Sequence, residues 1–265
     1  MGMSSDDVTG HFATVNGLAL YYETRGAGRP LVLIHGALMT IGLMQDYPAR
    51  LAAGRQVIAV ELQGHGHTAD AARPLRFEQL ADDIAALLDH LGLPEAGLFG
   101  FSIGAAVALQ VGIRHPARVR RVVAASVTYR TDGLHPELTA GDGADAGQLT
   151  GSVYHRAYQA VAPDPGQWPA LVAKVLDLDA QPQDWPAGQV AAITAPVMLI
   201  VADNDIVRLE HAVEMTHLLG GGIAGDLHGL PDARLAVIPG TTHTGLCDRA
   251  AWVVPMIEEF LDDRK

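Results

Sequence analysis

A serine between two glycines is the residue of this sequence best suited to nucleophilic chemistry. Ser102 stands in "LFGFSIGAAVALQVGIRHP" (residues 98–116), after an apolar run and before a helix-like run. A serine at a sharp turn from a strand into a helix is raised at the carboxyl edge of the sheet, and flanking glycines leave room for that turn. The helix start also directs the Ile103 amide at the same point. The pattern predicts a nucleophile, and the alternative is that Ser102 only caps the helix.

Two further residues supply the groups that a serine nucleophile needs. Asp205 follows the apolar run of "VMLIVADNDIV", and His243 follows that of "RLAVIPGTTHTGL". Histidine can accept the serine proton, while an aspartate holds the imidazole in the required tautomer. We therefore expect Ser102, His243 and Asp205 to be a catalytic triad, with Asp203 as the rival for the acid.

The segment "LVLIHGALMT" (residues 31–40) is placed to complete an oxyanion site. It reads as a buried strand that ends at His35, followed by a loop. That loop can deliver a backbone amide, from Ala37 or alternatively Leu38, to pair with the amide of Ile103. We expect His35 to organise the loop rather than act as a base. Such a mechanism uses water and needs no cofactor or metal.

Apolar residues near these positions predict an uncharged substrate. The loop, turn and base residues named here include no Arg or Lys that could bind a charged group. We therefore expect a small to medium ester as the small-molecule partner. The expected substrate contacts are Leu38, Met39, Phe101 and Leu246, together with Trp168, Trp185, Tyr154 and Tyr158. For the four last-named aromatic residues, packing is the alternative.

Two other motifs could suggest different chemistry. "GHGHT" holds His65 and His67, and imidazole is a common zinc ligand, but no matching ligand set adjoins them. We expect no metal there. Cys247, four residues after His243, is expected to be a small apolar wall residue because Ser102 already occupies the turn.

The elements that must position these residues alternate along the chain. Buried strands are expected at 31–35, 56–60, 96–101, 119–126, 197–201 and 234–239, and helices at about 77–91 and 103–114. Such alternation predicts an α/β protein with a mostly parallel sheet and helices on both faces. Asn16-Gly17 between two strand-like runs predicts a hairpin and an antiparallel edge.

The pattern changes between residues 129 and 192. The segment is first rich in Gly, Asp and Ala and then consists of helical pieces broken by prolines. Loops of this length are uncommon unless they have a function, so we expect a small helical cap, or lid, at 129–192. The core would comprise 1–128 and 193–265. The segment from 220 to 233 reads as a surface excursion.

Composition excludes several classes of partner. The chain has 265 residues, 49% hydrophobic residues and a formal net charge of −12, so clustered positive charge for nucleic acid or an anionic membrane is not expected. A single cysteine excludes an internal disulfide, and the start "MGMSSDDVTG" has no signal-peptide pattern. We expect a cytoplasmic protein, and the oligomeric state, monomer or homodimer, stays open.

Five segments together resemble the α/β-hydrolase fold family, of the single-domain esterase, haloperoxidase and C–C hydrolase kind. They are "HGALMT", "ELQGHGHTAD", "GFSIGAA", "VADNDIV" and "GTTH", in the family's order. Departures from the family pattern are Ala202 for a glycine, Glu61 for an aspartate and Ala105 for a glycine; we expect no effect of the last two on the chemistry. The resemblance implies a carboxylesterase-like hydrolase. Perhydrolase or C–C hydrolase activity on the same triad, and a receptor-like binding protein, are the alternatives.

Overall fold

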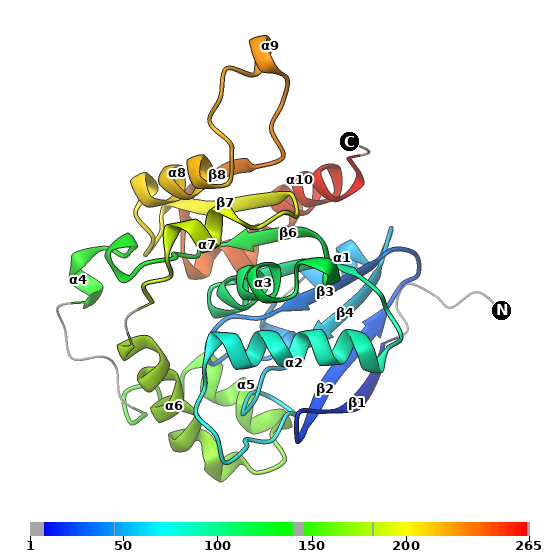
Figure 1. Cartoon of the computed structure of the whole chain (residues 1–265). Coiled ribbons are helices and arrows are strands. Elements are labelled where there is room, and N and C mark those ends of the chain that lie inside the picture. Colours follow the sequence, from blue (N-terminus) through cyan, green and yellow to red (C-terminus); the bar gives the residue numbers. More distant parts are fainter. Residues whose placement is uncertain (1–7, 45, 140–145, 182, 264–265) are drawn as a thin grey trace.

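Eight strands form one sheet in the order β1-β2-β4-β3-β5-β6-β7-β8 (Figure 1). This computed structural model describes residues 8–44, 46–139, 146–181 and 183–263, and the count refers to these. Strands β3 to β8 are parallel, and the β1–β2 and β2–β4 pairs are antiparallel. The bounds are β1 (Thr9–Val15), β2 (Leu18–Arg25), β3 (Pro30–Ile34), β4 (Gln56–Val60), β5 (Ala96–Phe101), β6 (Val119–Ala125), β7 (Val197–Asn204) and β8 (Arg234–Thr242).

The predicted strands and the antiparallel edge are confirmed. Each of the six apolar runs forms one of the strands β3 to β8, and all six residues of β5 are buried. Strands covered on both faces need apolar residues at successive positions, which explains the continuous runs. Between β1 and β2, Asn16 and Gly17 both have positive φ (46° and 80°), as a two-residue hairpin of this kind requires.

Helices cover both faces of the sheet, as expected. On β3, Val32 and Ile34 belong to the apolar cluster that includes α2 (Phe77–His90) and α3 (Ile103–Arg114). The alternate residues Leu31 and Leu33 belong to the cluster with α1 (Tyr47–Leu51) and α10 (Ala250–Asp262). Side chains of a strand alternate between faces, so one short run supplies both cores. A further helix of the sheet region, α8 (Leu209–Leu218), follows β7.

Between β6 and β7 the chain forms short helices. The described residues of this cap segment (129–139, 146–181 and 183–192) contain no strand. Its helices are η3 (Thr131–Gly133), α4 (Pro136–Thr139), α5 (Val153–Val161), η4 (Pro165–Gln167), α6 (Trp168–Ala180) and α7 (Ala187–Ala191). The division of the chain at 128 and 193 stays a prediction, and residues 140–145 and 182 of the segment lie outside the described residues.

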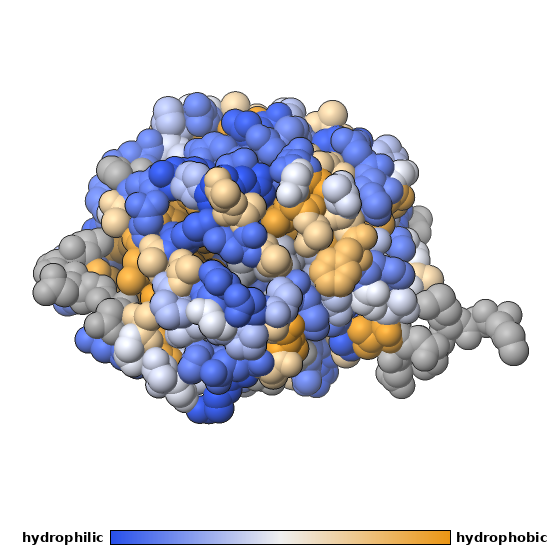
Figure 2. Space-filling view, turned by 90° about the horizontal axis from the view of Figure 1, so that it is seen from below, coloured by the Kyte–Doolittle hydropathy of each residue, from blue (hydrophilic) through white to orange (hydrophobic). Residues whose placement is uncertain are grey.

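Helices α5 and α6 lie together at one end of the molecule (Figure 1). Seen from that end, the surface is mainly hydrophilic, with apolar residues in small separate patches (Figure 2). The apolar side of α6 points inward, because Trp168, Leu171, Val172, Val175 and Leu178 are buried. The cap segment therefore shares the core of the sheet region.

The expected surface excursion is present between α8 and β8. It extends from the body and carries a short helix, α9 (Gly225–His228), that the sequence pattern did not indicate (Figure 1). In the described ranges, no helix has the length and apolar character needed to cross a membrane. The expectation about a signal peptide concerns mainly residues 1–7, which lie outside the described residues.

Candidate active site

Ser102 occupies a strained turn between β5 and α3. Its φ of 56° and ψ of −121° lie outside the regions that residues with a side chain normally adopt, and its amide donates to the carbonyl of Ala125 at 2.9 Å. A Cβ on Gly100 would stand 2.1 Å from the carbonyl oxygen of Gly104, and one on Gly104 would stand 2.3 Å from that of Ile34. The two glycines are therefore required by close backbone contacts on each side of the serine.

His243 joins the other two residues of the expected triad. Its Nε2 lies 3.1 Å from Oγ of Ser102, and its Nδ1 lies 2.9 Å from Oδ1 of Asp205. The three residues follow β5, β7 and β8, whose carboxyl ends share one edge of the sheet. In this geometry Ser102 can donate its proton to Nε2 while the N–H at Nδ1 donates to the carboxylate.

Asp205 is held by several donors besides the imidazole. Its Oδ2 accepts from Oγ of Ser126 at 2.5 Å and from the Ala202 amide at 2.9 Å, and Oδ1 accepts from the Ile206 amide at 2.8 Å. Burial by itself raises the pKa of Asp205, but the bonds from His243, Ser126 and the Ala202 amide outweigh it and lower that pKa below its usual value. The carboxylate can thus stay ionised while buried.

Asp203, the rival acid, has a different task. Its carboxylate is exposed and accepts hydrogen bonds from the amides of Gly240 and Thr241, both in β8. The pairing of β7 with β8 is irregular at this point, between residues 202 and 204. Asp203 therefore fastens the ends of two neighbouring strands, whereas Asp205 faces His243.

Ser126 was not found by sequence reasoning. It directly follows β6, the strand between β5 and β7, and has a φ of 55°. Its amide donates to the carbonyl of Ile200 at 2.7 Å, which fixes the residue against β7. A hydroxyl at the carboxyl end of a parallel strand was the available signal, since side chains at such ends meet at one edge of the sheet.

The two candidate amides for the second oxyanion donor differ in their partners. The Leu38 amide donates to Nε2 of His65 at 3.1 Å, so it is already engaged. Within the described residues, the amides of Ala37 and Ile103 have no recorded acceptor. Free donors are what an oxyanion site requires. The pair Ala37 and Ile103 stays a prediction, and this difference favours Ala37 over Leu38.

Two buried histidines hold the loop that carries Ala37. Nδ1 of His35 donates a hydrogen bond to the Gly36 carbonyl, and its Nε2 accepts one from the Leu62 amide. Nδ1 of His65 donates a hydrogen bond to the Gln63 carbonyl. Burial lowers the pKa of His35 to about 3 and that of His65 to about 4. Both rings are therefore neutral and each has one donor and one acceptor in use, which fits the expected loop-organising role of His35.

Glu61 connects the same loop to the next one. It is 1% exposed; Oε1 accepts from the Ile41 amide at 3.1 Å, and Oε2 accepts from the amide and Nδ1 of His67 at 2.6 and 2.9 Å. Burial raises the pKa of Glu61, and the bonds from His67 and Ile41 oppose that rise. The sequence analysis gave Glu61 no role in the chemistry, and the structure shows that its carboxylate connects two loops.

Where side chains are described, no group of three or more His, Cys, Asp or Glu residues could hold a metal ion.

The expected substrate contacts fall into two groups. Those nearest the triad are Leu38, Met39, Phe101 and Leu246; the ring of Phe101 lies 4.9 Å from that of His243, centroid to centroid. In the cap segment, Trp185 packs edge-on against Phe77, and Trp168 contacts His155 and Tyr158. Tyr154 packs against the apolar clusters of both faces. Burial of the two tryptophans favours the packing alternative, and contact with substrate stays a prediction for all eight residues.

Comparison with known proteins finds similarity to one fold family over part of the chain. A family model described as alpha/beta hydrolase fold matches residues 29–146, which include β3 to β6 and the Ser102 turn. The dihydrolipoyllysine-residue acetyltransferase component of the acetoin cleaving system of Pseudomonas putida is 43% identical over 110 residues, which are 40% of this chain and 30% of that protein. The alignment thus spans less than a third of that relative.

Two other matches extend over nearly the whole chain. The pimeloyl-[acyl-carrier protein] methyl ester esterase of Nitrosospira multiformis is 26% identical over 258 residues, covering 85% of this chain and 92% of that protein. Among solved structures, a meta-cleavage product hydrolase from Pseudomonas fluorescens IP01 superposes with a TM-score of 0.77 at 18% identity, covering 97% of this chain and 98% of the other. The second match shows a shared fold.

Proposed function

We propose that the chain is an enzyme of the α/β-hydrolase fold family, and that it cleaves a small to medium, uncharged carboxylic ester through an acyl-enzyme. The observation that carries the proposal is the position of His243, with one ring nitrogen at Oγ of Ser102 and the other at Asp205. A neutral imidazole so placed is a base for the serine and for water in turn.

The proposed reaction has two acyl-transfer steps. Oγ of Ser102 bonds to the ester carbon as its proton moves to Nε2 of His243, and the carbon–alcohol bond breaks as His243 returns that proton to the leaving oxygen. Water then repeats the sequence and releases the acid and free Ser102. Asp205 stabilises the imidazolium that forms each time.

The amides of Ala37 and Ile103 are proposed to bind the negative oxygen of each tetrahedral intermediate. One such donor contributes about 3 kcal/mol to the transition state in enzymes of this type. The network of His35, His65 and Glu61 supports the idea, because it fixes the loop that carries Ala37 before any substrate binds. A preformed site has no reorganisation cost during the reaction.

The choice of an ester rests on the surroundings of the triad. Phe101 and Leu246, beside Ser102 and His243, are apolar and buried, and they offer no charge to bind a carboxylate or phosphate. The relative from Nitrosospira multiformis is a methyl ester esterase by name. A serine nucleophile and an apolar surrounding together favour acyl transfer from an uncharged ester.

Turnover of p-nitrophenyl esters tests the proposal. We expect hydrolysis by the wild type and a loss of about a thousandfold or more in Ser102→Ala. The control Thr14→Ala, at an exposed position of β1, should keep the wild-type rates. A fluorophosphonate should label the wild type once, at Ser102. A wild type that binds esters without turnover would instead indicate a binding protein. If the protein acts only with hydrogen peroxide, or cleaves only a C–C bond, the proposed ester hydrolysis is wrong. Perhydrolase or C–C hydrolase activity would then take its place.

A further inference from the structure

The segment between α8 and β8, residues 220–233, extends from the body and carries α9 (Figure 1). We call it the arm. Its three large aliphatic side chains, Ile223, Leu227 and Leu230, are all exposed. Leu227 is 79% exposed and Leu230 is 68% exposed, more than any other large hydrophobic residue in the described part of the chain. Apolar side chains that gather on one exposed feature indicate a surface that a partner covers.

The outer edge of β8 lies at the same end of the molecule as the arm. This strand is the last in the strand order, so no strand of the described residues pairs with its outer edge. An unpaired strand edge can pair with a strand of another chain. The stretch Arg234–Ile238 precedes Pro239 and contains no proline, so its outward N–H and C=O groups can form such a ladder. Pro239 lacks an N–H group and ends it.

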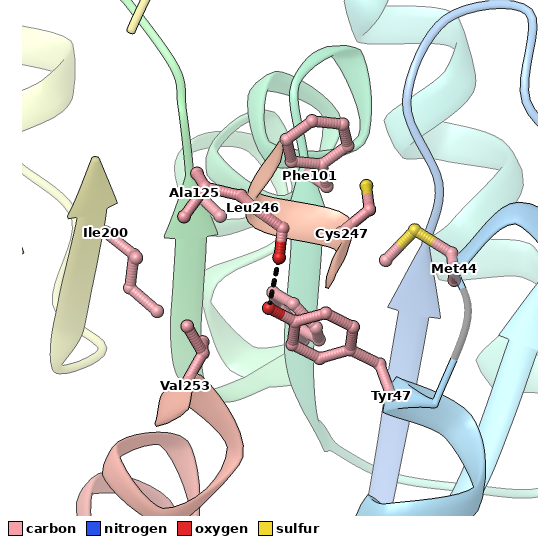
Figure 3. A pocket seen from close by; sticks show the side chains of 9 residues that line it. Met44, Tyr47, Phe101, Ala125, Ile200, Leu246, Cys247 and Val253 are labelled. Carbon is pink, nitrogen blue, oxygen red and sulfur yellow. Dashed lines mark hydrogen bonds between the residues drawn. The ribbon is translucent and has the colours of Figure 1, made fainter. Parts of the chain in front are cut away.

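A cation and an aromatic ring lie near the carboxyl end of β8. Arg249 donates from Nη2 to the Gly240 carbonyl at 3.0 Å, and its guanidinium carbon lies 5.0 Å from the centre of the Trp252 ring. Within the described residues, Arg249 has no carboxylate partner. Val253 faces the core beside Ile200 (Figure 3), whereas Trp252, one position earlier in α10, is 53% exposed. The charge and the ring are both available to a partner.

Antiparallel pairing of two β8 strands would bring the arm of one copy to this end of the other. Ala236 is the middle residue of the stretch that can pair, and a two-fold axis there sets residue 232 of one copy opposite residue 240 of the other. Asp232 would then lie close to Gly240 and the Arg249 that is bonded to it. Because the arm joins β8 at its amino end, its apolar side chains would lie on the side of Trp252.

We infer that the partner is a second copy of this chain, and that the two copies form a two-fold dimer through β8 and the arm. The surface is self-complementary, since each copy offers a strand edge, an acidic and apolar arm, and a basic and aromatic end of β8; a two-fold axis satisfies every contact twice. The net charge of −12 opposes association of two copies. The strand at the interface contains no acidic residue, and the pair of Asp232 with Arg249 offsets the repulsion locally.

A charge exchange tests the inference. We expect the wild type to be a dimer in sedimentation equilibrium. Asp232→Arg and Arg249→Asp should each raise the Kd of the dimer by about tenfold or more, because each substitution acts at both symmetric contacts. The double variant exchanges the two charges and should recover most of the affinity. A double variant weaker than both single variants would overturn the pairing of these residues and the two-fold arrangement with it.

The apolar part of the arm is tested separately, which keeps the result decisive if Arg249→Asp does not fold. Leu227→Asp should raise the Kd by about tenfold or more. The matched control is Phe12→Asp, an exposed residue of β1 at the other edge of the sheet, and it should keep the dimer. A monomeric wild type would overturn the inference and leave the arm to a different protein. A dimer that Leu227→Asp leaves intact, or that Phe12→Asp dissociates, would also overturn it.

Discussion

The hydroxyl of Ser126 donates to Oδ2 of Asp205 at 2.5 Å, while Oδ1 of the same carboxylate lies 2.9 Å from Nδ1 of His243. The first contact joins the ends of β6 and β7, and the second joins the ends of β7 and β8. A residue outside the expected triad thus helps to fix the orientation of the expected catalytic acid.

Removal of that hydroxyl should reduce kcat more than it changes KM. In Ser126→Ala the carboxylate loses one hydrogen bond to a charged group, which corresponds to a loss of about tenfold or more in rate. The pKa of Asp205 should rise, because one of the bonds that lower it is gone. As the pH is lowered, kcat of the variant should therefore begin to fall at a higher pH than kcat of the wild type. Equal profiles for wild type and variant would show that Ser126 has no positioning role.

Unfolding free energy should fall as the pH drops from about 6.5 toward 4. Burial depresses the folded pKa values of His35 and His65 to about 3 and about 4, while an unfolded histidine has a pKa of about 6.5. In this window these two rings let the unfolded chain bind up to two more protons, so their contribution to stability decreases with falling pH, by about 2.7 kcal/mol per pH unit at most.

Urea denaturation at pH 7.0, 6.0 and 5.0 measures that slope. His65→Gln, which keeps an acceptor for the Leu38 amide, should have a smaller slope than the wild type because one of the titrating rings is absent. His228→Gln, in the exposed helix α9, is the control and should have the full slope. A slope that is the same in all three proteins would contradict the assignment.

Gly104→Ala should be far more destabilising than Gly112→Ala in the same helix. The added Cβ at 104 would meet the backbone oxygen of Ile34 at 2.3 Å, and backbone cannot turn aside as a side chain can. At 112 the nearest atom is in the side chain of Ile193, at 3.3 Å, and alanine favours the helix. We expect Gly104→Ala to lower the free energy of unfolding by at least about 3 kcal/mol. Gly112→Ala should change it by no more than about 1 kcal/mol. Chemical denaturation of both variants measures the difference.

Tyr154 and Trp185 should respond differently to truncation. Tyr154 is partly buried and packs against both apolar clusters, so Tyr154→Ala should alter the ratio of kcat/KM for p-nitrophenyl acetate to that for the butyrate, and Tyr154→Phe should not. Trp185 is buried against Phe77, so Trp185→Ala should cost about 3 kcal/mol of stability and keep the ratio. Ester kinetics with thermal melts separate the two effects. A changed ratio in Trp185→Ala would restore that residue as a substrate contact.

The sequence by itself determined the strands of the sheet, the hairpin and the strained turn. Runs such as residues 31–34 and 96–101 have apolar residues at successive positions because both faces of a parallel strand are buried, and this property is local. Gly100 and Gly104 likewise mark a turn in which backbone approaches backbone. Asn16-Gly17 specified the hairpin through two positive φ angles. Each of these features depends on residues close together in the chain.

Only the tertiary structure decided which side chains meet. Asp203 and Asp205 are two residues apart in one short segment, and the packing of β7 against β8 placed the first on backbone amides and the second against His243. The contacts of Ser126 with Asp205 and of Glu61 with Ile41 likewise join residues that are distant in the sequence. Such contacts depend on strand order, register and rotamer, which arise from the packing of the whole chain, so no local pattern specifies them.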